Sequence, residues 1–289
     1  MKAKLIDKKG EQDITVTTPD LTVKVNRTTG LISEYTYRGK SLLGEGGTLK
    51  PNFWRAPTDN DFGAGLQKKF QVWKNPVMNL KGVAVEKDKK ANTISICATY
   101  EMPEVKGELE IEYLIMPNTG AMKVSQEFDA SDDAKVSDLF RFGMDKSQYY
   151  GRGPIENYSD REDCMRIGIY SDDADNQYFP YIRPQESGTK GDMRWWNQTD
   201  ASGFGFKVKS CKPFYASAIH FDTEELDDGD DKDQRHSFNL KKSKFTNLFL
   251  DAEHSGVAGE NSWGAWPLEK YRLHYGDKNF TFVLIPLDK

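Results

Sequence analysis

Most of this chain is a succession of short runs in which apolar and polar residues alternate, and that pattern severely limits the possible folds. From Glu108 to Ile115 the alternation is almost unbroken, with glutamates on one face and apolar side chains on the other. A period of two residues is that of a β-strand with one buried face. The alternation predicts strands at residues 21–26, 31–37, 93–98, 108–115, 122–128, 204–209, 215–221, 271–275 and 280–285.

Helical patterns are weak by comparison. No stretch of ten residues combines a convincing 3.6-residue period with capping residues. Turn-rich segments separate the consecutive strand runs, which favours antiparallel neighbours. We therefore predict an all-β protein built as a large antiparallel sandwich.

Charge and hydropathy argue against two classes of partner. The 289 residues carry a net charge of -5, with a pI near 5.6 and a mean hydropathy of -0.72. A nucleic-acid surface needs clustered Lys and Arg, and a membrane helix needs roughly 20 consecutive apolar residues. The first residues also lack the apolar centre of a signal peptide. We expect no nucleic-acid and no membrane partner. No targeting signal in the sequence indicates a compartment.

The residue types that usually carry catalysis or bind metals show no recognisable arrangement. The three cysteines are widely spaced, and Cys97 and Cys211 lie in or beside strand-like runs, where we predict small buried side chains. The four histidines show neither HxH nor HExxH spacing, and no GxSxG motif is present. The 45 acidic residues neither exclude nor single out the carboxylate pair that a glycosidase needs. We predict no metal site and assign no catalytic residue.

A dense patch without helical or strand period occupies residues 52–63. It contains two aromatic residues before Arg55, and two carboxylates, Asp59 and Asp61, shortly after it. An arginine so close to aspartates most often forms charge-assisted pairs that brace a loop. Direct contact with a ligand or with a metal is the alternative, although Asp59–Asp61 is too compact for a known calcium loop.

Other segments also interrupt the strand pattern. The Gly-Arg-Gly-Pro sequence within residues 149–161 is expected to break any regular element, and residues 180–196 form a further patch. Arginine–carboxylate pairs commonly replace the backbone ladder that such loops lack. Residues 70–76 are predicted to be a surface excursion, and the acidic run 224–233 a solvated loop.

The stretch 253–267 places Trp263 and Trp266 among glycines and small polar residues, as in a loop that holds indole rings near solvent. An indole face with Glu260 and Asn261 beside it suits a sugar, whose C–H face stacks and whose hydroxyls form hydrogen bonds. The alternative, equally open from the residues, is that both tryptophans close the end of the sandwich.

Four motifs follow one another along the chain: FWRAPTDND at 53–61, YGRGPIENYSDR at 150–161, PYIRPQESG at 180–188 and SW at 262–263. In this order and spacing they resemble the C-terminal domain of family 2 β-galactosidases, from about residue 20 to about residue 286. The resemblance implies one domain over residues 1–289, with the galactose mutarotase-like supersandwich architecture.

The resemblance also implies that this domain and the catalytic domain of the enzyme have different roles. In the family a catalytic (β/α) barrel supplies both catalytic glutamates, and this chain has neither the pattern nor the room for a barrel. We therefore expect a detached domain or a small subunit that is inactive alone and has the barrel and a galactoside as partners. No cofactor is expected in this domain, and any Mg²⁺ or Na⁺ of the parent enzyme is expected in the barrel. The parent is expected to be a homo-oligomer.

The same resemblance implies roles for particular residues. Trp263 matches the tryptophan that stacks on the sugar, with Asn261 and Glu260 beside it as substrate-binding residues. Residues 62–65 match a mobile loop near the mouth of the active site. The residues expected to support the base of that loop are Arg55, Asp59, Asn60 and Asp61.

Two other functions remain open. A stand-alone aldose epimerase of the mutarotase type would share the fold and would need a general acid facing a general base. His220 and His254 are its candidates, and neither has an evident partner in the sequence. A free-standing carbohydrate-binding module is the other alternative. The glycosidic specificity of the parent is not encoded here, because in the family it depends mainly on the barrel.

Overall fold

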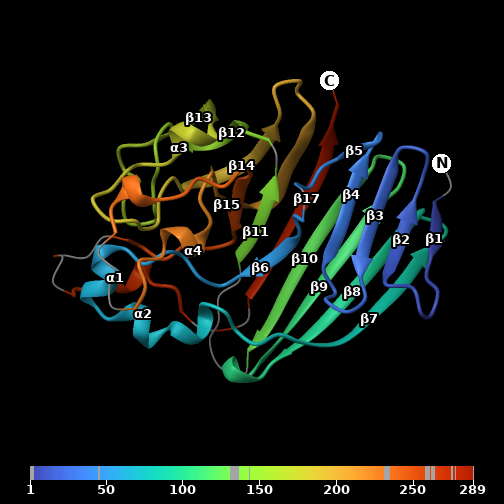
Figure 1. Cartoon of the computed structure of the whole chain (residues 1–289), viewed down its shortest axis with the longest axis horizontal. Coiled ribbons are helices and arrows are strands. Elements are labelled where there is room, and N and C mark those ends of the chain that lie inside the picture. The colour runs from blue at the N-terminus through green and yellow to red at the C-terminus, as the bar shows by residue number, and fades with distance from the viewer. Residues whose placement is uncertain are drawn as a thin grey trace.

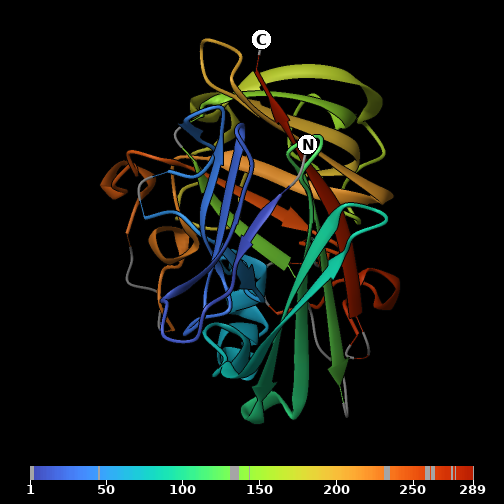
Figure 2. The ribbon, with the colours of Figure 1, turned by 90° about the vertical axis from the view of Figure 1, so that its right-hand side faces the viewer.

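Antiparallel strands make up most of the chain, as the alternation predicts. A computed structural model describes residues 3–44, 46–130, 137–142, 144–230, 235–257, 261, 264–274, 276 and 278–288, with the backbone alone at 130 and 137–142. The strands form a sheet of five and a sheet of twelve. Figure 1 shows the small sheet in front of one end of the large sheet, and Figure 2 shows the two as separate layers.

The order of strands across each sheet differs from their order in the chain only in the large sheet. Across the small sheet the order is β1 (Lys4–Ile6), β2 (Asp13–Thr17), β3 (Leu21–Asn26), β4 (Ile32–Tyr37) and β5 (Lys40–Ser41). Across the large sheet it is β13 (Arg166–Asp173), β12 (Lys146–Gly153), β14 (Lys190–Thr199), β15 (Gly205–Ile219), β17 (Lys278–Leu287), β10 (Ala121–Ala130), β9 (Gly107–Met116), β8 (Thr93–Met102) and β7 (Asn79–Asp88). Its remaining strands are β16 (Thr246–Asp251), which pairs with β15 and β11, and β11 (Ser137–Phe142), which also pairs with β6 (Leu49–Asn52).

The described helical segments are all short. They are α1 (Asp59–Gly63), α2 (Leu66–Lys69), η1 (Gln71–Trp73), η2 (Pro103–Val105), α3 (Ala174–Gln177), α4 (Thr223–Leu226), η3 (Ser237–Asn239) and η4 (Glu269–Tyr271). None of them has the length or the apolar character needed to cross a bilayer.

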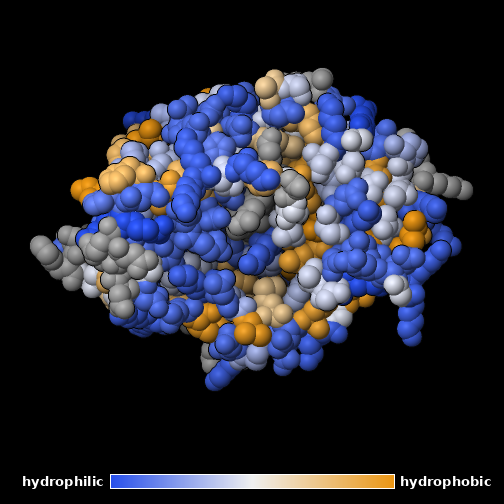
Figure 3. All heavy atoms as spheres, viewed as in Figure 1, coloured by the Kyte–Doolittle hydropathy of each residue, from blue (hydrophilic) through white to orange (hydrophobic). Residues whose placement is uncertain are grey.

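The main hydrophobic core lies between the two sheets. Val23 of β3 and Tyr113 of β9 are fully buried members of this core, whereas Glu108 and Glu110 point to solvent as predicted. The hydroxyl of Tyr35 in β4 donates a 2.7 Å hydrogen bond to the carbonyl of Gly120, which joins the sheets across the core. On the face seen in Figure 3, hydrophilic residues cover most of the surface. Strands such as β3 and β9 thus give one face to the core and one to water.

Two predicted strands are one, and two predicted loops contain strands. Residues 204–209 and 215–221 belong largely to the single strand β15. The expectation that Gly-Arg-Gly-Pro breaks regular structure is wrong for Gly151–Gly153, because β12 continues to Gly153. A Cβ at Gly151 would lie 2.3 Å from the Met193 side chain, so this glycine allows close packing within the sheet. Residues 190–196 likewise belong to β14 rather than to a loop.

The strand predicted at 271–275 is wrong over its described part. The backbone N–H of Arg272 donates to the carbonyl of Glu269 at the end of η4, and Arg272 Nε donates to the Pro267 carbonyl at 2.7 Å. These contacts fold the segment back on itself. Position 275 lies outside the described residues.

The acidic run is not a solvated loop over residues 224–230. Asp228 is fully buried, and its Oδ1 lies 3.3 Å from Nε of Arg235. Asp227 is also buried, where it accepts from Trp54 Nε1 at 2.9 Å and pairs with Lys74 at 2.8 Å. Trp54 and Lys74 from distant segments allow Asp227 to be buried, and the nearby Arg235 does the same for Asp228.

Residues 70–76 are only partly a surface excursion. Trp73 is buried in the core and packs against Phe53 and Phe128, with ring centroids 5.8 and 6.1 Å away. The prediction of buried cysteines is wrong for Cys211, which is exposed, and Cys97 is only half-buried.

Candidate functional site

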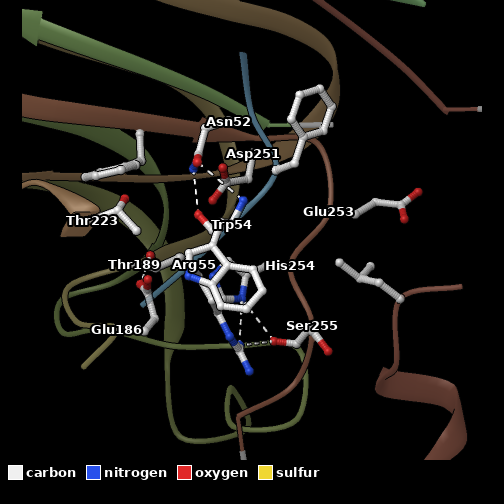
Figure 4. A pocket seen from close by; sticks show the side chains of 13 residues that line it. Asn52, Trp54, Arg55, Glu186, Thr189, Thr223, Asp251, Glu253, His254 and Ser255 are labelled. Atoms are coloured by element: carbon white, nitrogen blue, oxygen red, sulfur yellow. Dashed lines mark hydrogen bonds between the residues drawn. The ribbon is translucent and has the colours of Figure 1, made fainter. Parts of the chain in front are cut away.

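The loops that the sequence singles out converge on the guanidinium of Arg55 (Figure 4). Its Nη2 donates to both carboxylate oxygens of Asp61 at 2.9 Å. Its two terminal nitrogens also donate to the carbonyl oxygens of Ser255, at 2.8 Å, and of Gly256, at 3.1 Å. Burial alone would lower the pKa of Arg55, but the carboxylates of Asp61 and Glu186 raise it above its usual value. One cation, with a side chain only 18% exposed, therefore joins segments that are about 200 residues apart in the chain.

Asp61 is also part of a capping box at the start of α1. Thr58 is the N-cap, its hydroxyl accepts from the Asp61 N–H at 3.2 Å, and the Asp61 carboxylate accepts from the Thr58 N–H at 2.9 Å. This reciprocal pair satisfies two backbone donors at the helix start. The helical turn was missed because its five residues are too few to show a period, but the Thr58-x-x-Asp61 spacing is its signal.

The other two predicted support residues behave differently from each other. Asn60 Nδ2 donates to the carbonyl of Val257 at 2.8 Å, so it holds the same loop segment as Arg55 does. Asp59 is half-exposed, and its Oδ1 lies 3.8 Å from Nε of Arg183. The bracing role predicted for this patch is thus visible at Arg55, Asn60 and Asp61.

Residues 255–257 are held from a third side by the second motif. Asp160 Oδ1 accepts from the Val257 N–H at 3.1 Å. A Cβ at Gly256 would lie 2.2 Å from Oδ2 of the same aspartate, so a larger residue there would displace the Asp160 carboxylate. The corner predicted within residues 156–161 is confirmed, because Arg161 pairs with Glu156 at 2.7 Å.

The chain is fixed again immediately after the tryptophan loop. Gly264 has a φ of +118°, and a Cβ there would lie 2.5 Å from the carbonyl oxygen of Gly63 at the end of α1. The predicted sugar-binding residues Glu260 and Trp263 lie outside the described residues, and Asn261 between them is exposed. Both stems of residues 258–263 are therefore anchored to α1 and its surroundings.

Glu186 lines the cavity shown in Figure 4, which measures about 60 Å³ and which Arg55 and His254 also line. Its carboxylate accepts from the Thr189 hydroxyl at 2.6 Å. Burial raises the pKa of Glu186 to about 7, against the lowering effects of Thr189 and Arg55. A carboxyl whose pKa lies near neutrality changes its protonation state within the ordinary pH range.

Replacing Glu186 with glutamine should flatten the pH dependence of stability between pH 4.5 and about 7. Because the folded-state pKa is raised, this carboxyl favours folding fully below pH 4.5, and the contribution is lost as the pH rises through about 7. Over this pH range the wild type loses at most about 3 kcal/mol of folding stability through Glu186, because this residue is half-buried rather than enclosed. Urea midpoints from about pH 4 to about pH 8 measure it. Parallel pH profiles for wild type and Glu186→Gln would contradict it.

The histidines proposed for an epimerase both have neighbours that the sequence did not reveal. His254 is buried, and its Nδ1 lies 2.9 Å from the Ser255 carbonyl. His220 Nε2 lies 3.6 Å from Asp175 and 3.9 Å from Asp145. Among the described residues no three His, Cys, Asp or Glu side chains are grouped as metal ligands would be.

Comparison with known proteins decides the family. The profile of the β-galactosidase small chain matches residues 17–284. The chain belongs to this family. It is 30% identical over 285 residues to a β-galactosidase of Priestia megaterium, and 26% identical over 285 residues to one of Halalkalibacterium halodurans. These alignments cover 96% and 95% of this chain but 27% of each relative. The small-chain domain thus spans about a quarter of the length of these curated relatives.

The fold of the small-chain domain is also found in solved structures of other proteins. A galactose 1-epimerase from Lactobacillus acidophilus superimposes with a TM-score of 0.53, over 98% of each chain and with 10% sequence identity. The galactose mutarotase-like architecture expected from the sequence is confirmed. At this identity the likeness shows the fold alone.

Proposed function

We propose that this small-chain domain completes the galactoside-binding site of a catalytic barrel carried on another segment or chain of a family 2 β-galactosidase. The domain itself supplies no catalytic residue and does not hydrolyse galactosides alone. The observation that carries the proposal is that the described residues on both sides of 258–263 are anchored. Arg55, Asn60 and Asp160 hold the stem before them, and Gly264 packs on α1 after them. Rigid stems limit the entropy that a binding loop loses when it engages a ligand.

The composition of that loop fits the sugar. Trp263 offers a flat apolar face for the C–H face of galactose, and Asn261 and Glu260 offer groups for its hydroxyls. The partners in this proposal are the barrel and the galactoside. The domain needs no cofactor, any Mg²⁺ or Na⁺ binds in the barrel, and the assembled enzyme is a homo-oligomer.

Replacing Trp263 with alanine should lower kcat/KM of the assembled enzyme about tenfold, because one stacked ring contributes on the order of 1–2 kcal/mol. The assay combines this chain with the barrel-bearing part of the same enzyme and measures hydrolysis of 4-nitrophenyl β-galactoside. Trp195→Ala is the control, because Trp195 is a half-buried residue of β14 on the large sheet. The proposal fails if the chain cleaves the substrate unaided, or if Trp263→Ala behaves like the control.

One observation favours aldose epimerisation as a second candidate function. Glu186 and His254 line the same cavity, as an acid–base pair would. The cavity of about 60 Å³ is, however, less than half the volume of about 150 Å³ that admits a single benzene ring. A hexose does not fit without movement, so we rank this candidate second. Polarimetry on fresh α-galactose tests it, with Glu186→Gln as the inactive control.

A further inference from the structure

Two surface loops carry the most exposed large apolar side chains in the described part of the chain. Phe238 of η3 is 83% exposed, and Ile182, in the loop that follows α3, is 81% exposed. Phe179 of the same loop is 56% exposed. Exposed apolar residues that stand alone are ordinary, whereas a group of them marks a surface that another molecule covers. These three side chains are called the apolar patch below.

Hydrogen bonds bring the two loops together, although Ser237 follows Tyr181 by 56 residues in the chain. The Ser237 hydroxyl donates to the carbonyl of Tyr181 and accepts from the Tyr178 hydroxyl at 3.1 Å. His236 Nδ1 lies 3.2 Å from the carbonyl oxygen of Ile182. The patch therefore forms where two adjoining loops meet.

The patch is held in one conformation. Ser187 Oγ accepts from the N–H of Phe179 at 2.8 Å and lies 3.3 Å from the carbonyl oxygen of the same residue. The ring of Phe179 packs on Tyr181 with 4.7 Å between centroids. The ring of Phe238 stacks on His236, with 5.4 Å between centroids and 15° between planes. A surface that is already ordered loses little entropy when a partner binds to it.

The patch adjoins α1, the short helix to which the tryptophan loop is also anchored. Arg183, in the loop after α3, has its Nε 3.8 Å from Oδ1 of Asp59. Gln185 of the same loop accepts from the N–H of Asp59 through Oε1 at 3.1 Å. Gly264 packs against the other end of α1. Figure 1 shows the loop after α3 and α1 at the same end of the molecule. The patch and residues 258–263 therefore belong to one side of the domain.

We propose that the apolar patch is a docking surface for the barrel-bearing part of the β-galactosidase. The proposal rests on the proposed function, which puts the barrel on the side of residues 258–263. The length of the relatives supports this occupant, because the chain covers 27% of each and the larger part of such an enzyme lies outside it. An apolar centre flanked by charged residues such as Asp59 and Arg183 is the usual anatomy of a protein interface.

Thiol labelling of the assembled enzyme tests the proposal. The variants Ile182→Cys and Phe238→Cys are treated with a maleimide, and mass spectrometry of peptides separates the introduced thiols from the native ones. Assembly with the barrel-bearing part should slow labelling at both positions at least about tenfold, because a covered thiol reacts only when the interface opens. Ile169→Cys is the matched control, since Ile169 of β13 is 65% exposed and lies outside the patch. Its labelling rate should not change.

Phe238→Ser should weaken assembly but leave the chemistry intact. Loss of one apolar anchor should raise about thirtyfold the concentration of this chain that gives half-maximal hydrolysis of 4-nitrophenyl β-galactoside. At saturating concentrations of the chain, kcat/KM should equal that of the wild type. Ile169→Ser should assemble as the wild type does. Thermal unfolding of the chain alone checks that both variants are folded.

The outcomes separate the docking surface from the proposed function. If assembly leaves labelling at positions 182 and 238 unchanged, or if Phe238→Ser assembles normally, the patch is not the docking surface, whatever Trp263→Ala does to kcat/KM. If both positions are protected but Trp263→Ala has no effect, the docking surface is correct and the shared sugar site is wrong. A dimer of the chain alone that Phe238→Ser dissociates in sedimentation would identify a second copy as the occupant and overturn the proposal.

Discussion

Replacing Arg55 with methionine should destabilise the protein by about 3–5 kcal/mol, the usual cost of removing one partner of a buried ion pair. Asp61, 6% exposed, would keep its cap on α1 but lose both hydrogen bonds from the guanidinium. The carbonyls of Ser255 and Gly256 would lose their donors as well. Urea unfolding at neutral pH measures the change.

Two comparisons show whether the loss comes from the buried pair. Arg38→Met removes an arginine that pairs with Asp288 at the surface, and it should change the urea midpoint little. The double variant Arg55→Met with Asp61→Leu should recover part of the lost stability, because no charge is left unpaired in the interior. If the double variant is as unstable as the sum of the single variants, the ion pair is not the cause.

Loss of Arg55 should also abolish most activity of the assembled enzyme, even under conditions where the variant is folded. Arg55 anchors the stem that leads to residues 258–263, and a displacement of about 1 Å there is enough to misplace a binding loop. The activity of the folded variant, compared with that of Arg38→Met, measures this effect.

The sequence predicted the architecture because most strands bury one face. In β3 and β9 every second residue is buried, and the alternation shows it directly. The alternation did not reveal the strands β12 to β14, where glycines and aromatic residues pack closely. Gly151 lies in the middle of a strand because Met193 on the neighbouring strand fills its space. Such packing partners are 42 residues apart in the chain, so a local pattern cannot reveal them.

The candidate site was predictable only where its partners are neighbours in sequence. Arg55 and Asp61 are six residues apart, and their pairing followed from that spacing. Asp227 was assigned to solvent because Trp54, 173 residues away in the chain, and Lys74 bond it only in the folded chain. A titration near neutrality at Glu186 depends on burial, which composition does not encode.

Lys190 is a buried cation that the sequence pattern likewise did not reveal. It is 1% exposed, donates to Gln177 Oε1 at 3.2 Å, and burial lowers its pKa to about 8. The interior accommodates this lysine because Gln177 belongs to a buried polar chain. In this chain, hydrogen bonds join Gln177 to Ser147 and Ser147 to Gln198. No sequence rule places a lysine in the interior.

That polar chain ends at Trp196, and Trp196→Ala should cost about 3–5 kcal/mol of stability. The indole is fully buried and stacks on Tyr149 with 4.9 Å between centroids and 9° between planes. Its Nε1 donates to Gln198 Oε1 at 2.8 Å, so truncation opens a cavity and removes a hydrogen bond at once. Urea or thermal unfolding measures the effect.

Trp195 provides the control within the same dipeptide. It points to the other face of β14, is half-buried, and has Lys207 Nζ 4.6 Å from its ring centroid. Trp195→Ala should therefore cost no more than about 1 kcal/mol. Equal losses for the two variants would contradict the assignment of β14 faces. A large loss confined to Trp196 would show that the alternation of the strand decides which of two adjacent indoles supports the fold.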